Sequence, residues 1–263
     1  MINLAAIVPH TPLLVPSIGG DKFERLQTTI LALQAISQSP EFATLDTLVI
    51  FSKHGATQEK AFSVNLSDEY QVDLSAFGDL SHSERYRPDY QTIDTLQREL
   101  RRLNQPITLD SETKLDHSCA VPLLTLGVNP SRVRLILLSP CELPLNNHFA
   151  FGQALRDIFL ASDKKIGLIA SGDLSHALST ESPAGFALAG PVFDAAIQKA
   201  VKSGQLANLQ KYDEASLAAA EQCLMRPLLL LAGVLNEQPY TLNYFSYDSP
   251  FGVGYLTAEL NLN

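Results

Sequence analysis

The hydrophobic residues of the chain follow two alternating patterns, short apolar runs typical of buried strands and longer stretches with helical spacing. Apolar runs rich in β-branched residues predict strands over residues 3–8, 46–51, 132–138 and 165–170. Apolar residues three or four positions apart predict helices at about 21–37, 88–103, 147–161, 191–203 and 213–235. Strands separated by helices in this way are typical of α/β proteins, in which helices cover both faces of the sheet.

The first of these helical stretches shows its buried face most clearly. Its core-facing positions are Phe23, Leu26, Ile30, Leu33 and Ile36. Such a stripe covers one side of a helix and predicts packing against the sheet.

The end of the chain follows a different pattern, in which apolar and polar residues alternate. The segments "PYTLNYFSYD" and "VGYLTAEL" have this two-residue period, and "SPFG" between them is typical of a turn. They predict an antiparallel pair added to the sheet. We therefore expect an α/β fold, a single domain over residues 1–263, built as a three-layer α/β/α sandwich around a mixed, mostly parallel sheet. The Ser- and Asp-rich stretch 63–87 is the most loop-like segment.

Composition and charge narrow the class of protein. The chain of 263 residues is 46% hydrophobic, enough for a large core, and its net charge is −9. Its longest basic run is Arg101-Arg102, so we expect no nucleic-acid partner. We also expect no membrane span and no signal peptide, since a long apolar stretch is missing. Three widely spaced cysteines favour a reducing cytoplasm over a disulfide framework. We expect a homo-oligomer.

Three of the six histidines follow predicted strands directly. His10 lies in "VPHTPLL", His54 in "FSKHGA" and His176 in "SGDLSH". Loops that leave the carboxyl ends of parallel strands converge on one crevice, where ligands bind in α/β proteins. His117, in "LDHSCAVPLL", begins an apolar helix and is a fourth candidate for this crevice.

A structural role is the alternative for each of these histidines. A single histidine at the end of a strand is more often a hydrogen-bonded structural residue than a ligand, but three after three strands favour a site. The other two, His82 and His148, have polar neighbours, and we interpret them as exposed surface residues.

Several residues near the histidines add further chemistry. Asp173 precedes His176 by three residues and could orient its imidazole, or it could cap a helix. Two neutral imidazoles and a carboxylate form the facial triad of non-haem Fe(II) enzymes. Glu221 is the candidate carboxylate, because burial among apolar neighbours is costly unless a cation is near. Its alternatives are an exposed helix position and an ion pair with Arg226, and Cys223 is a rival ligand.

Taken in order, six motifs resemble the catalytic subunit of class III extradiol ring-cleavage dioxygenases, a superfamily that includes the Memo proteins. The motifs are "VPHTPLL", "SKHGA", "LDHSCAVPL", "SGDLSH", "AAEQCLMRP" and "FGVGY". The ordered set is specific although no single motif is, and the resemblance runs from residue 4 to about 258.

The resemblance implies a function and a set of site residues. Carried over from these dioxygenases, His10, His54 and Glu221 are the Fe(II) ligands, His176 is the acid–base histidine, and His117 lies near the substrate. Asp116, which precedes His117, is also a candidate helix cap. The implied reaction is extradiol cleavage of a catechol-type aromatic by O2.

Alternatives come from the motif "EQC", in which Glu221, Gln222 and Cys223 can all align with the third ligand. A thiolate there favours zinc or copper over iron. The alternative functions are a Memo-like metal-binding, redox or binding protein without oxygenase activity, and a zinc-dependent enzyme resembling a hydrolase.

Overall fold

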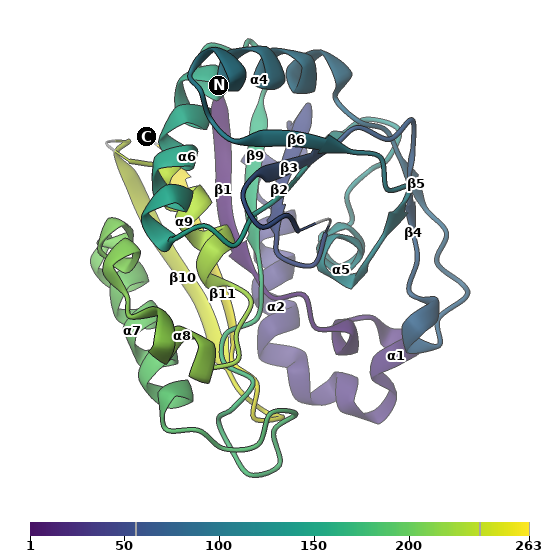
Figure 1. Cartoon of the computed structure of the whole chain (residues 1–263). Coiled ribbons are helices and arrows are strands. Elements are labelled where there is room, and N and C mark those ends of the chain that lie inside the picture. The colour runs from purple at the N-terminus through teal and green to yellow at the C-terminus, as the bar shows by residue number, and fades with distance from the viewer. Residues whose placement is uncertain (56, 237, 263) are drawn as a thin grey trace.

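Helices cover both faces of a mixed sheet in the computed structural model of the chain (Figure 1), which describes residues 1–55, 57–236 and 238–262. In spatial order, the strands of this sheet are β10 (Tyr240–Asp248), β11 (Tyr255–Leu262), β1 (Ile2–Val8), β9 (Ile166–Ser171), β2 (Thr47–Ser52), β8 (Arg134–Ser139), β3 (Phe62–Asn65) and β6 (Ile107–Asp110). The neighbours from β1 to β8 are parallel, whereas β10, β11 and β1 pair in antiparallel fashion. Strand β3 is antiparallel to β8 and parallel to β6.

Two clusters of buried hydrophobic side chains lie on the two faces of the sheet. The cluster on one face includes residues of α4 (Tyr90–Arg102), α6 (Leu145–Leu160), α7 (Ala189–Ser203) and α9 (Met225–Val234). The cluster on the other face includes residues of α2 (Gln27–Ser37), α3 (Pro40–Ala43) and α5 (His117–Thr125). A small sheet made of β5 (Arg85–Tyr86), β4 (Tyr70–Val72) and β7 (Lys114–Leu115) adjoins the second cluster. The three-layer α/β fold with a mixed sheet is therefore confirmed.

Shorter elements complete the chain and are described here by their bounds. They are η1 (Pro12–Leu14), α1 (Pro16–Gly19), η2 (Gly20–Leu26), η3 (Ser75–Phe77), η4 (Leu206–Lys211) and α8 (Glu214–Ala219).

The sequence pattern predicted β1, β2, β8, β9 and the C-terminal pair within one or two residues of their observed bounds, and it missed β3 and β6 of the main sheet. The stripe predicted for 21–37 also packs inward: Leu26, Leu33 and Ile36 are buried between the helix and the sheet. Residues 20–26 form the 3-10 helix η2, however, and the α-helix begins only at Gln27.

One prediction about secondary structure was wrong. The stretch 213–235 is not one helix, because α8 ends at Ala219 and α9 begins at Met225. Glu221, between them, has a φ of 47°, which no α-helix accommodates. The stretch 63–87, the most loop-like segment by sequence, lies mostly outside regular elements, although it contains most of β3, all of β4 and β5, and η3.

The prediction of one domain stays a prediction, and both helix layers pack on the same sheet. Among the described residues, no helix combines the length and the apolar character needed to cross a bilayer.

Candidate metal centre and active site

Four histidines meet at the carboxyl edge of the sheet, as the strand-end pattern predicts. The ring centroids of His10, His54 and His117 lie 4.9 to 5.2 Å from one another. His176 lines the same pocket, whose volume is about 710 Å³. Three of the four follow β1, β2 and β9, which are adjacent parallel strands (Figure 1) and therefore end at one edge.

His10, His54 and Cys223 form the group best placed to hold a metal ion in the described part of the chain. One possible ligand atom from each of the three residues lies within 4.8 Å of the other two. His10 and Cys223 are buried, and His54 is exposed. Two imidazoles and one thiol at this spacing suit a transition metal.

Hydrogen bonds fix the ring of His10 in one tautomer. Its Nδ1 lies 3.0 Å from the hydroxyl oxygen of Ser171, and this hydroxyl donates its own proton to the carbonyl oxygen of Ser118 at 2.6 Å. Nδ1 must therefore be the protonated nitrogen that donates to Ser171. Nε2 keeps its lone pair and lies 3.2 Å from the sulfur of Cys223. A partner on the second nitrogen is the usual way in which proteins orient a histidine ligand.

Replacing Ser171 by alanine should lower metal affinity by about 10- to 100-fold, because the ring of His10 loses the acceptor that fixes its tautomer. Competition with a chromophoric chelator measures this affinity. The matched control is Ser63→Ala, which removes another buried hydroxyl of the same sheet, bonded to Asp110. Equal affinities in wild type and Ser171→Ala would contradict this role.

The environment keeps both imidazoles neutral. Burial, followed by the neighbouring His54 and His117, lowers the pKa of His10 well below its usual value. Burial also lowers the pKa of His54 to about 4. Both rings therefore have a free lone pair at neutral pH, as ligation requires. Burial raises the pKa of the Cys223 thiol, with the nearby Asp173 as the second cause.

Glu221, the predicted carboxylate ligand, does not belong to this group. Its side chain is exposed, in the turn between α8 and α9. The side-chain oxygen of Gln222 accepts a hydrogen bond from the backbone N–H of Met225 at 2.8 Å, at the start of α9. Of the three residues of "EQC", Cys223 is the one whose side chain lies beside His10.

Cys223 is held in place by Asp173, in the loop that follows β9. The backbone N–H of Asp173 lies 3.1 Å from its sulfur, and the backbone N–H of Cys223 points back to the carbonyl oxygen of Asp173 at 3.3 Å. Gly172 allows this contact, since a Cβ there would lie 2.6 Å from the Cα of Leu224.

The carboxylate of Asp173 is bonded to a residue that the sequence did not suggest. A third role inferred from the sequence, a hydrogen bond to a substrate hydroxyl, stays a prediction, and Asp173 lines the pocket. Its carboxylate accepts a hydrogen bond from the backbone N–H of His10 at 2.9 Å. No helix begins at Asp173 in the described structure, so it is not a helix cap. Burial raises the pKa of this carboxyl to about 6. Asp173 thus fixes the backbone of His10 rather than the ring of His176.

The ring of His176 is oriented by a backbone carbonyl instead. Its Nδ1 lies 2.5 Å from the carbonyl oxygen of Glu221, which can only accept. Nδ1 is therefore protonated, and Nε2 is the nitrogen left to exchange protons with a ligand. The side chain is half-buried at the wall of the pocket.

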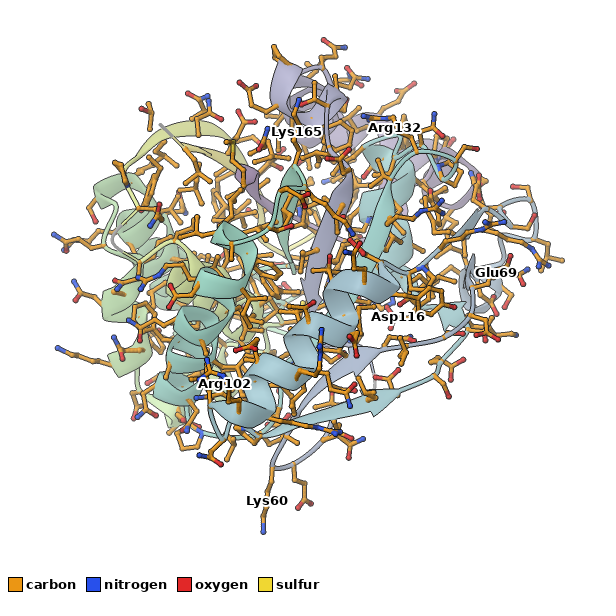
Figure 2. All side chains as sticks on the ribbon, turned by 90° about the horizontal axis from the view of Figure 1, so that it is seen from above. Lys60, Glu69, Arg102, Asp116, Arg132 and Lys165 are labelled. Carbon is orange, nitrogen blue, oxygen red and sulfur yellow. The ribbon has the colours of Figure 1, made fainter. Side chains whose placement is uncertain are left out.

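His117 begins α5, as predicted, and Asp116 caps this helix. The Asp116 carboxylate accepts a hydrogen bond from the backbone N–H of Ser118 at 2.7 Å. In the view of Figure 2, Asp116 lies within the outline of the molecule, whereas the side chain of Lys60 extends outward. The ring of Phe77 lies 5.2 Å from that of His117. The sequence did not identify Phe77, because it belongs to the stretch interpreted as loop.

Cations at the pocket wall were also not identified from the sequence. Lys22 and Arg25, both on η2, line the pocket together with Phe251. The Arg25 guanidinium lies 4.5 Å from the centre of the Phe251 ring and donates to the carbonyl oxygen of Pro250 at 2.5 Å. Both cations are exposed, and the same pocket is also lined by the carboxylates of Asp173 and Glu181. An anionic group of a ligand would therefore bind at η2, beside the two cations.

His148 and His82 lie outside this pocket. His148 was predicted to be exposed, but it is fully buried, because its ring nitrogens are bonded to the backbone of Pro144 and Cys141. Both partners belong to the loop before α6, which closes over the ring. His82 is partly exposed and pairs with Asp79 at 2.6 Å.

Comparison with known proteins supports the family resemblance that the sequence motifs indicate. Residues 4–258 match the sequence model of a family described as the catalytic LigB subunit of aromatic ring-opening dioxygenase. The protein CA_C1420 of Clostridium acetobutylicum is 24% identical over 98% of this chain, and the chain spans 57% of that protein's length. The uncharacterized protein JW3007 of Escherichia coli K12 has the same fold, with a TM-score of 0.68 and 18% identity, over 98% of this chain and 100% of that one.

Proposed function

Because the chain belongs to the family of the catalytic LigB subunit of aromatic ring-opening dioxygenases, we propose that it is a metal-dependent enzyme that opens the ring of a catechol-type aromatic with O2. The observation that carries this proposal is the meeting of four histidines and Cys223 at one pocket. Such a pocket can bind a metal and still leave two histidines to act on a ligand.

The residues present fit a divalent transition metal. His10 and His54 offer neutral imidazoles. The Nε2 lone pair of His10 is on the side of the ring that faces the sulfur of Cys223. When bound there, a metal would supply Lewis-acid polarisation of the substrate hydroxyls and, if it is redox-active, a site for O2. Fe(II) is the metal of the proposed reaction. Zinc and copper are the alternatives, because Cys223 replaces the carboxylate that usually completes an iron site.

The remaining side chains would handle protons and position the substrate. Nε2 of His176 would take the proton of a substrate hydroxyl and later return it, since an imidazole with a free lone pair is suited to both steps. His117, whose ring lies 4.9 Å from that of His54 in the same pocket, would hydrogen-bond a substrate oxygen. Asp173 would act through the backbone of His10.

The cations at the pocket wall predict a preference for catechols that carry a carboxylate. We expect Arg25→Gln to raise KM for an acidic catechol by about fivefold, which corresponds to loss of one exposed charge interaction of roughly 1 kcal/mol. KM for the methyl ester of the same compound should not change. Steady-state oxygen consumption measures both, and equal effects on acid and ester would contradict anion recognition.

A second candidate function is favoured by the thiol. A site with two imidazoles and one thiolate is also typical of copper and zinc proteins. The protein would then be a Memo-like metal-binding or redox protein, or a zinc enzyme in which a metal-bound water attacks the substrate.

One experiment separates these functions. The protein is loaded anaerobically with Fe(II), Zn(II) or Cu(I), and its affinity for each metal is measured. Each loaded form is then screened with a panel of catechols for oxygen consumption and for the yellow ring-opened product. Ring opening that requires Fe(II) supports the dioxygenase. Tight binding of zinc or copper without oxygen consumption supports the second candidate.

A further inference from the structure

The turn formed by residues 220–224 is hydrogen-bonded along its length to the loop that follows β9. At its start, the hydroxyl of Ser175 donates to the carbonyl oxygen of Ala220 at 2.7 Å. At its end, the backbone N–H of Cys223 points to the carbonyl oxygen of Asp173 at 3.3 Å. One turn therefore fixes the candidate ligand Cys223 relative to the loop that carries the acid–base candidate.

Between these two contacts, one backbone oxygen holds His176 twice. The carbonyl oxygen of Glu221 accepts a hydrogen bond from the backbone N–H of His176 at 2.9 Å. The same oxygen accepts from the ring Nδ1 of His176 at 2.5 Å. Both the position of the residue and the tautomer of its ring thus depend on where this oxygen points.

The direction of this carbonyl depends on an unusual backbone conformation. Glu221 has a φ of 47°, in the left-handed region, which glutamate rarely adopts because its Cβ clashes with the backbone. Such conformations persist where the surroundings hold them, and they cluster at functional sites. The Glu221 carboxylate is exposed and lies outside the group of candidate ligands.

We infer that Glu221 is a positioning residue for His176, acting through its left-handed backbone and carbonyl oxygen and not through its carboxylate. The inference rests on the proposed function, in which Nε2 of His176 moves protons. A carbonyl acceptor on Nδ1 leaves the lone pair of a neutral ring on Nε2, where the substrate binds. In the other tautomer, Nε2 would carry the proton and could not act as a base.

Three substitutions at this one position separate the backbone from the side chain. Glu221→Gln removes the charge and keeps a side chain of the same shape, so kcat should stay within about twofold of wild type. Glu221→Gly favours positive φ and removes the side chain, so kcat should again be retained. Glu221→Val places a β-branched residue in the left-handed region, where it is strongly disfavoured, and kcat should fall by about 100-fold with little change in KM.

A second readout does not depend on metal or activity. The 15N chemical shifts of the His176 ring in metal-free protein report which nitrogen carries the proton. Wild type, Glu221→Gln and Glu221→Gly should all show the proton on Nδ1, whereas Glu221→Val should show a mixture of tautomers. If Glu221→Val does not fold, the other three proteins still test the inference through these shifts.

The outcomes distinguish this inference from the proposed function. Loss of metal and activity in Glu221→Gln would overturn it, since the carboxylate would then be the functional group. A proton on Nε2 in wild type would also overturn it. If neither the wild type nor any of the three variants opens a catechol ring, the proposed function fails. The positioning role of Glu221 stands in that case if the tautomers of His176 follow the expected pattern.

Discussion

Cys223→Ala should lower the affinity of the protein for zinc and Fe(II) by more than about 100-fold, a larger loss than removal of a residue that only orients a ligand. Its sulfur is buried and lies 3.2 Å from Nε2 of His10. Alanine leaves only the two imidazoles of the candidate group. Glu221→Gln should leave metal affinity unchanged, because the Glu221 side chain is exposed and lies outside the group.

Chelator competition on matched variants checks this ranking. Cys141→Ala is the control, since it removes another buried thiol that is not part of the candidate group. It should bind metal like wild type. If Glu221→Gln loses the metal and Cys223→Ala retains it, the third ligand is the carboxylate, as the family resemblance implies.

The protons released on metal binding give an independent test of the same ligand. At pH 7 both imidazoles are already neutral, whereas burial keeps the Cys223 thiol protonated. Binding should therefore release about one proton, and affinity should rise about tenfold for each pH unit between 6 and 8. Below pH of about 4, where His54 becomes protonated, the affinity should fall more steeply. Calorimetry in two buffers of different ionisation enthalpy measures the protons, and a value near zero at pH 7 would favour Glu221.

The sequence was sufficient to predict the histidine cluster but did not single out Cys223 as the candidate third ligand. The cluster follows from strand order, because His10, His54 and His176 come after strands whose apolar runs are easy to recognise. The ligand depends on a break in a segment of good helix formers, "EASLAAAEQCLMR", which contains no glycine or proline. The break is imposed by tertiary hydrogen bonds to the loop after β9, and these have no local sequence signal.

Local polarity was misleading in two other places. The neighbours of His148 in "PLNNHFA" are polar, yet its ring is buried, because the backbone of the preceding loop satisfies both nitrogens. The stretch 63–87 contains many polar residues, yet Ser63 and Asn65 lie within the main sheet, where their side chains are hydrogen-bonded to β6 and the segment after it. In both cases hydrogen bonds to the polar side chains, from the preceding loop for His148 and from segments distant in sequence for Ser63 and Asn65, make a polar segment part of the interior.

The second large effect is expected for the acid–base candidate. His176→Gln should lower kcat for ring opening by about 10²- to 10⁴-fold, the usual contribution of a positioned general base. Its Nδ1 is held by a carbonyl, so Nε2 is the nitrogen available to the substrate. Metal content should stay at the wild-type level, because the candidate ligands are His10, His54 and Cys223. Glutamine is a suitable replacement, as it keeps a polar side chain but cannot take a proton near neutral pH.

Kinetics and metal analysis together decide whether His176 acts on protons or only on structure. The control is His82→Asn, which removes a histidine outside the pocket and should leave kcat unchanged. A base in the reaction predicts that kcat of the wild type depends on pH and that His176→Gln loses this dependence. A merely structural histidine predicts a lower melting temperature and an unaltered pH profile. If kcat is unchanged in His176→Gln and the metal site is fully occupied, another group transfers the proton. His117 would then be the next residue to test, because it lies in the same pocket.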